Sequence, residues 1–160
     1  MKINYINKNK EIKMVDISKK KDAKRIASAF CSVKFQKSSF NQLMKEGSPK
    51  GEIFNLAKCS GILAAKKTDE LIPLCHNINL SSIEINYKKN LKKHTIEIHS
   101  TVKTNSNTGV EMEALTACSI AALTIYDMCK AIDKSICIQD LKLLYKSGGR
   151  SGIFKNEKIF

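Results

Sequence analysis

One segment constrains the fold more than any other: residues 109–132, GVEMEALTACSIAALTIYDMCKAI, where small or apolar residues occupy nearly every position. Thr108 precedes it as a suitable N-cap, and the segment is long enough for a helix of about six turns. A helix that is apolar on nearly all sides is buried on most of them. One sheet covers only one side of such a helix, so we expect a homo-oligomer to cover the rest.

Four charged residues interrupt this apolar helix, and they are Glu111, Glu113, Asp127 and Lys130. Charged groups on a buried helix cost free energy unless they are paired or functional. Asp127 and Lys130 are three residues apart, lie on one face and can touch. They can form an ordinary intrahelical ion pair, or an acid/base pair in a poorly hydrated cleft. Spacing alone leaves both interpretations open.

Glu113 and Asp127 cannot serve one reacting centre within one chain. Fourteen residues return the helix to within roughly 40° of the same face but separate the two carboxyl groups by about 21 Å. Either Glu113 holds a remote part of a long ligand, or it serves the site of a neighbouring subunit. The second alternative agrees with the expected oligomer.

The remaining hydrophobic patterns predict an α+β fold. We expect a strand at 24–36, a helix from Ser38 to Gly47, a helix at 51–68, a hairpin at 80–104, and a strand at 135–146 with a bulge near Gln139 and Asp140. With the long helix included, this order predicts a ferredoxin-like antiparallel sheet with helices packed on one face. Residues 1–160 form one domain, with flexible arms at 1–13 and 155–160 and a mobile Gly/Ser-rich loop after the last strand.

A row of small residues marks one face of the helix expected at 51–68. Its members are Ala57, Ser60, Gly61, Ala64 and Ala65. Small side chains allow two elements to approach closely. We therefore expect this helix to lie unusually close to a neighbouring element.

The chain is strongly basic, with a net charge of +13 from 28 basic and 15 acidic residues. This balance suits an anionic partner, either nucleic acid, a membrane surface or a phosphorylated small molecule. No uncharged apolar run is long enough for a membrane span, and the polar N-terminus does not resemble a signal peptide. The six cysteines show no C-x-x-C spacing, so we expect free thiols in a cytoplasmic protein and no metal site.

Cys75 and His76 stand together just before the predicted hairpin, in LIPLCHNINL. Adjacent side chains of an extended chain point to opposite faces, which argues against a Cys–His nucleophilic pair. His76 remains either a hydrogen-bonding or acid/base residue or a structural loop histidine. The later segment YKSGGRSG lacks the residue order of a P-loop. A flexible loop that contacts anions is possible there, complemented by Lys146 and Lys50.

Five blocks of this sequence resemble the cyclic pyranopterin monophosphate synthase family of molybdenum-cofactor (molybdopterin) biosynthesis. They are MVDIS (14–18), PLCH (73–76), TGVEMEALTA (108–117), ALTIYDMCKA (122–131) and LLYKSGG (143–149). The resemblance covers nearly the whole chain. It implies a ferredoxin-like fold and a homohexamer, a trimer of dimers, with active sites at subunit interfaces.

The resemblance also implies the reaction of a lyase. The small-molecule substrate is (8S)-3′,8-cyclo-7,8-dihydroguanosine 5′-triphosphate, and the products are cyclic pyranopterin monophosphate and pyrophosphate. Opening and re-closing of the rings need repeated proton transfers, and the leaving pyrophosphate needs cationic support. The family needs no cofactor, and no fingerprint of a nucleotide cofactor occurs in the chain.

Residue by residue, the family pattern assigns the predicted site. Asp127 matches the catalytic acid/base and Lys130 the neighbouring catalytic lysine. The residues expected to bind substrate are Leu74, Cys75, His76, Met112 and Glu113, with Lys50, Lys66 and Lys146 binding phosphates or assisting ring chemistry. The main departure is Asn77, where the family usually has a proline.

A basic nucleic-acid-binding module on the same fold is the alternative from another functional class. The net charge favours it. Its expected aromatic platform is missing, because the central strands offer Ile, Ser and Lys rather than interleaved Phe or Tyr. A purely structural subunit is a third alternative, although charged residues on an apolar helix make poor sense in one. We therefore predict an enzyme without nucleic-acid or membrane partners.

Overall fold

The alternating segment near the N-terminus forms the central strand, β1 (Ala23–Lys34), of an antiparallel sheet. In the computed structural model, which describes residues 6, 9–149 and 152–156, the neighbours of β1 are β3 (Thr95–Ser106) and β4 (Cys137–Gly149). The outer strands are β2 (Ser82–Asn90) and β5 (Gly152–Lys155), which gives the order β2-β3-β1-β4-β5. Alternate side chains of β1 point toward the helices and are fully buried, which is the period of two expected of a half-covered sheet.

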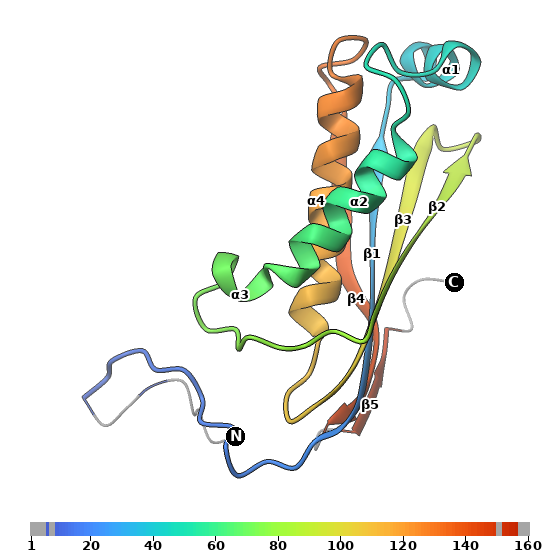
Figure 1. The fold of residues 1–160 in the computed structure, drawn as a ribbon. Helices are drawn as coiled ribbons and strands as arrows, with labels where there is room; N and C mark the ends of the chain where they lie inside the picture. Colours follow the sequence, from blue (N-terminus) through green and yellow to red (C-terminus); the bar gives the residue numbers. More distant parts are fainter. Residues whose placement is uncertain (1–5, 7–8, 150–151, 157–160) are drawn as a thin grey trace.

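Four helices accompany the sheet, so the fold is α+β as predicted (Figure 1). They are α1 (Lys37–Glu46), α2 (Phe54–Lys66), α3 (Thr68–Leu71) and α4 (Glu111–Cys129). The two long helices α2 and α4 lie side by side over one face of the sheet (Figure 1). The long apolar segment is thus the central helix, as its composition indicated.

Helices α2 and α4 approach closely at Gly61. A Cβ atom at that position would lie 2.8 Å from the carbonyl oxygen of Ala117 and 3.3 Å from the Cβ of Ala121. No side chain fits there unless α2 or α4 moves. The predicted close approach of the small-residue face is confirmed.

The core face of α4 includes Ala114, Ala121 and Ile125, all fully buried. On the opposite side, Leu123 of the single chain is 52% exposed. By length and composition alone α4 qualifies as a membrane span, but 56% of that window is buried inside the fold, as in the core helix of a globular protein. The expected burial on most sides is therefore incomplete in one chain.

Strand β4 carries the bulge that its sequence indicated. Phe30 pairs with Lys142 and Ser32 with Gln139, so β4 has one more residue than β1 between these pairs. Asp140 adopts a left-handed backbone there, with φ of 59°. The predicted bulge is confirmed.

The chain beyond residue 146 differs from the prediction. Strand β4 continues to Gly149 and pairs antiparallel with β5, so the prediction of a loop and arm for 147–155 is wrong at 147–149 and 152–155, the part that the structure describes. The apolar Ile153 and Phe154 belong to the added strand, which fits the strand preference of such side chains. Residues 1–5, 7–8 and 157–160 of the predicted arms lie outside the described residues.

Candidate active site

The C-terminal end of α4 holds a carboxylate between two ammonium groups. Asp127 Oδ1 lies 2.7 Å from Lys130 Nζ, and Asp127 Oδ2 lies 2.7 Å from Lys50 Nζ. We call these three residues the acid–lysine cluster. Hydrogen bonds from Lys130 and Lys50 lower the pKa of Asp127 to about 2. The hydrogen bond with Asp127 in turn raises the pKa of Lys130. Asp127 is therefore an anion at any physiological pH.

The pairing of Asp127 with Lys130 confirms the contact that their spacing predicted. The expectation that both are buried is wrong for the single chain, since their side chains are 53% and 50% exposed. The core face of this last turn is formed by Met128 and Cys129, and helical geometry turns Asp127 away from it. Lys50 comes from the loop between α1 and α2. No local pattern reveals its contact with Asp127, because 77 residues separate them.

The N-terminal end of α4 forms the wall of a cavity of about 320 Å³. Five predicted substrate-binding residues line it together, and these are Leu74, Cys75, His76, Met112 and Glu113. The loop before β2 contributes the first three and α4 the last two. The N-terminal segment contributes further lining residues, Val15, Ile17 and Lys20.

Glu113 is the buried acid of this cavity, with only 4% of its surface exposed. Burial is the main cause that raises its pKa to about 7, with a smaller contribution from the negative charge of Glu111. A carboxyl group with this pKa can accept or release a proton near neutral pH. Burial and the nearby Glu113 also raise the pKa of the Cys75 thiol, which favours its neutral form.

His76 and Asn107 hold the N-terminal segment across the cavity. The Nε2 of His76 lies 2.7 Å from the carbonyl oxygen of Val15, and the side-chain amide of Asn107 donates to the carbonyl of Ile17 at 3.2 Å. A carbonyl only accepts, so Nε2 is the donor, and Nδ1 of the neutral ring remains an acceptor. The side-chain amide of Asn77 donates to Asp69 at 2.7 Å and so ties the loop to α3 without the proline usual in the family.

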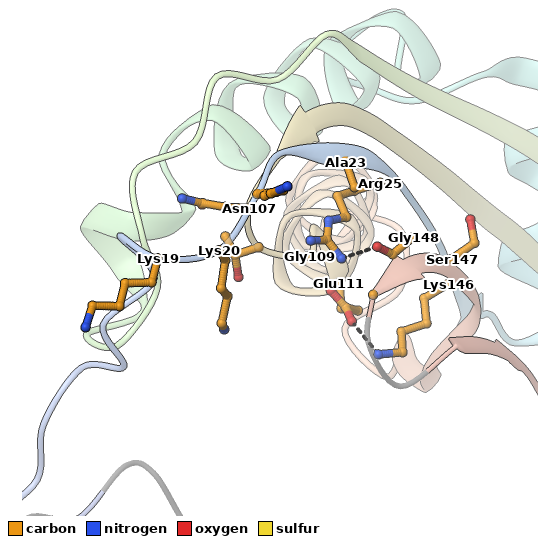
Figure 2. A pocket seen from close by; sticks show the side chains of 13 residues that line it. Lys19, Lys20, Ala23, Arg25, Asn107, Gly109, Glu111, Lys146, Ser147 and Gly148 are labelled. Carbon is orange, nitrogen blue, oxygen red and sulfur yellow. Dashed lines mark hydrogen bonds and ion pairs between the residues drawn. The ribbon is translucent and has the colours of Figure 1, made fainter.

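A second cavity, of about 840 Å³, adjoins the first and shares four lining residues with it, Lys20, Thr108, Gly109 and Glu111. Figure 2 shows Lys146 pointing toward Glu111, 3.2 Å from its carboxylate, and Arg25 pointing toward the Gly148 carbonyl. Arg25 is 8% exposed as a whole residue, and its guanidinium also donates from Nε to the Ser106 carbonyl at 3.0 Å.

This second cavity is rich in cations. Its basic lining residues are Lys19, Lys20, Lys21, Arg25 and Lys146. Clustered ammonium and guanidinium groups attract phosphate groups and bind them through charge-assisted hydrogen bonds. Among them, only Lys146 was a predicted site residue. The others gave no distinct signal because the sequence contains 28 basic residues.

Of the remaining predicted site residues, Lys66 lies at the exposed C-terminal end of α2 and lines neither cavity. Lys50 belongs to the acid–lysine cluster. The structure therefore divides the predicted site between the two ends of α4, about 21 Å apart by helical rise. Within the residues that the structure describes, no group of three His, Cys, Asp or Glu side chains is placed to hold a metal ion.

A cationic cavity beside a pocket with a buried carboxyl group of raised pKa is typical of an enzyme that acts on a small molecule. Comparison with known proteins agrees, because the MoaC family matches residues 14–149, and the chain belongs to that family. The chain is 46% identical over 155 residues to the cyclic pyranopterin monophosphate synthase of Bordetella avium. The aligned residues make up 97% of this chain and 96% of that protein. It is also 42% identical over 159 residues to the protein of that name from Peptoclostridium acidaminophilum, covering 99% and 100%.

Proposed function

We propose that this chain converts (8S)-3′,8-cyclo-7,8-dihydroguanosine 5′-triphosphate to cyclic pyranopterin monophosphate and pyrophosphate. The two joined cavities carry the proposal. One is lined by cations suited to a triphosphate, and the other contains a buried acid suited to proton transfer on the purine. The relatives named cyclic pyranopterin monophosphate synthase support this assignment. The protein is a lyase of molybdenum-cofactor biosynthesis, and we place it in the cytoplasm.

In this mechanism, the triphosphate binds in the larger cavity beside Arg25 and Lys146. The base lies in the smaller cavity, where Glu113 and the Nδ1 of His76 exchange protons during opening and re-closing of the rings. The cations balance the charge that develops on the leaving pyrophosphate. Asp127 is the anionic acid/base of the reaction, and Lys130 and Lys50 orient its carboxylate.

A complete site requires a second copy of the chain. Asp127 lies at the far end of α4 from Glu113, and no single reacting centre spans about 21 Å. We infer that Asp127 of one subunit faces the cavities of its neighbour in a homohexamer, arranged as a trimer of dimers. The exposed Leu56 and Leu63 of α2 and Leu123 of α4 give such an interface apolar surface. The strand order β2-β3-β1-β4 supports a ferredoxin-like fold with β5 added at the edge.

Mixing two inactive variants tests this arrangement. Asp127→Asn subunits are dissociated and reassembled with Glu113→Ala subunits, and conversion of the cyclised GTP derivative to the pterin is followed. A mixed assembly contains some sites with both wild-type residues, so activity returns. If each variant is inactive alone and the mixture, shown by mass to be hybrid, is inactive as well, the shared site is wrong. If the wild-type chain does not convert the substrate, the proposed reaction is wrong.

A further inference from the structure

The loop that brings Lys50 to Asp127 has a backbone that needs external support. It runs from Gly47 to Gly51, whose φ angles are 80° and 99°, in the region that favours glycine. Glycines at both ends leave the loop many conformations before folding. The Gly51 amide donates to the Ser48 carbonyl at 3.1 Å, which closes a short turn around Pro49 and Lys50.

The hydroxyl group of Ser48 joins this turn to α4. It donates to the carbonyl oxygen of Met128 at 2.6 Å and accepts from the backbone amide of Lys50 at 3.2 Å. Met128 directly follows Asp127. In a continuing helix its carbonyl would accept from Ile132, but that amide donates to Cys129 instead. Ser48 thus pairs with a carbonyl that the end of the helix leaves open, and the Ser48 hydroxyl links the backbone of Lys50 to the residue that follows Asp127.

The contact between Lys50 and Asp127 cannot hold the loop by itself. Both side chains are exposed, by 41% and 53%, and exposed ion pairs contribute little because water screens them and long side chains lose entropy. The distance of 2.7 Å between Lys50 Nζ and Asp127 Oδ2 therefore depends on a backbone that already holds Lys50 near Asp127. Apart from Lys50, the side chain of this turn that forms a hydrogen bond with α4 is that of Ser48.

We propose that Ser48 is a positioning residue of the proposed reaction: its hydroxyl fixes the 47–51 turn on the Met128 carbonyl and thereby sets Lys50 against Asp127. This inference rests on the proposed function for its kinetic consequence but not for its geometry. With Lys130 on Oδ1 and Lys50 on Oδ2, each oxygen of Asp127 has one fixed partner, and together the two partners orient the carboxylate. Without Ser48, Oδ2 loses a fixed partner and the carboxylate can rotate.

A double-mutant cycle separates positioning from a merely structural role. The variants are Ser48→Ala, Lys50→Ala, and both together. Loss of one hydrogen bond predicts that Ser48→Ala lowers kcat about three- to tenfold. Because Ser48 acts through Lys50, the double variant has the kcat of Lys50→Ala alone. Ser48→Thr, which keeps the hydroxyl, retains most of the wild-type kcat.

The matched control is Ser60→Ala, which removes a hydroxyl-to-carbonyl hydrogen bond of 3.0 Å within α2, away from this loop. We expect it to leave kcat unchanged. The proposal is overturned by either of two results. One is a fold reduction in kcat of the double variant that equals the product of the reductions in Ser48→Ala and Lys50→Ala. The other is an unchanged kcat in Ser48→Ala.

A second measurement is independent of the reaction. Titration of the Asp127 carboxyl carbon by NMR gives its pKa directly, which Lys50 helps to lower. We expect this pKa to rise toward its ordinary value in Ser48→Ala and in Lys50→Ala, but to stay low in Ser60→Ala. If Ser48→Ala leaves it unchanged, the positioning role is wrong, whatever the enzyme's activity. If the wild-type chain is inactive while Ser48→Ala raises the pKa, the reaction is wrong but the positioning of Lys50 stands.

Discussion

The two ends of α4 carry carboxylic acids on nearly the same helix face, yet their surroundings give them opposite properties. Asp127 is half exposed and lies between two ammonium groups, and its pKa falls to about 2. Glu113 is buried beneath the N-terminal segment and the Cys75 loop, and its pKa rises to about 7. Surroundings, rather than residue type or spacing, make the first an anion at rest, ready to accept a proton, and the second a carboxyl group that is partly protonated near neutrality.

The largest expected effect comes from removing the negative charge of Asp127. Asp127→Asn keeps the shape of the side chain but abolishes its charge and basicity, so we expect kcat to fall about 10²–10⁴-fold. Because Asn has nearly the same shape as Asp and the side chain lies outside the core of the chain, we expect little change in fold or in the mass of the assembly. Steady-state turnover, circular dichroism and light scattering measure the three quantities.

Glu70→Gln is the matched control for this variant. It removes an exposed ion pair with Lys67 that has the same i,i+3 spacing as Asp127 and Lys130, at 3.2 Å. Its turnover should equal that of the wild type. Near-native turnover of Asp127→Asn would remove Asp127 from the chemistry and leave an ordinary surface ion pair.

The buried acid should instead appear in the pH dependence of stability. The folded-state pKa of Glu113, about 7, lies above the ordinary 4.5, so the unfolded chain loses this proton first. The contribution of protonated Glu113 is complete below about pH 4.5 and disappears as the pH rises through 7. Glu113→Gln cannot ionise. Relative to this variant, the wild type should therefore lose up to about 3 kcal/mol of unfolding free energy between pH 5 and 8.

Urea unfolding at a fixed protomer concentration tests this prediction at both pH values. Glu46→Gln, which removes an exposed carboxylate from α1, controls for the change in net charge. Parallel stability curves for the wild type and Glu113→Gln would mean that Glu113 is ionised throughout this range. The contrast between the two ends of α4 would then be lost.

The middle of α4, between its two ends, packs closely against α2 at Gly61. Gly61→Ala places a methyl group 2.8 Å from the Ala117 carbonyl, which forces the helices apart. Overpacking of this kind predicts a loss of about 1–3 kcal/mol of stability, although alanine favours helices more than glycine does. Thermal unfolding measures it, with Ser60→Ala as the neighbouring control on the same helix. A stabilised Gly61→Ala variant would show that α2 and α4 are not in tight contact.

The sequence predicted the features that follow from local periodicity. The apolar helix, the Asp127–Lys130 contact and the β4 bulge arise from residues close in the chain. The partnership of Lys50 with Asp127 and the cationic cavity around Arg25 arise from residues up to 123 positions apart. Among so many lysines, no local pattern distinguishes those that line a cavity. The exposure of Asp127 also depends on which faces of α4 are covered by α2 and by the sheet. That coverage is set by tertiary packing and not by local sequence.

The smallest expected effect concerns the loop that carries Leu74, Cys75 and His76. The amide of Asn77 restrains this loop through Asp69, and an exposed hydrogen bond contributes about 0.5 kcal/mol. In Asn77→Ala, substrate binding must order the loop, so we expect KM to rise about two- to threefold with kcat unchanged. Asn86→Ala, which loses a similar amide-to-carboxylate bond to Glu84 on β2, is the control. A fall in kcat at constant KM would instead show that Asn77 positions His76 for proton exchange and does not mainly order the loop for binding.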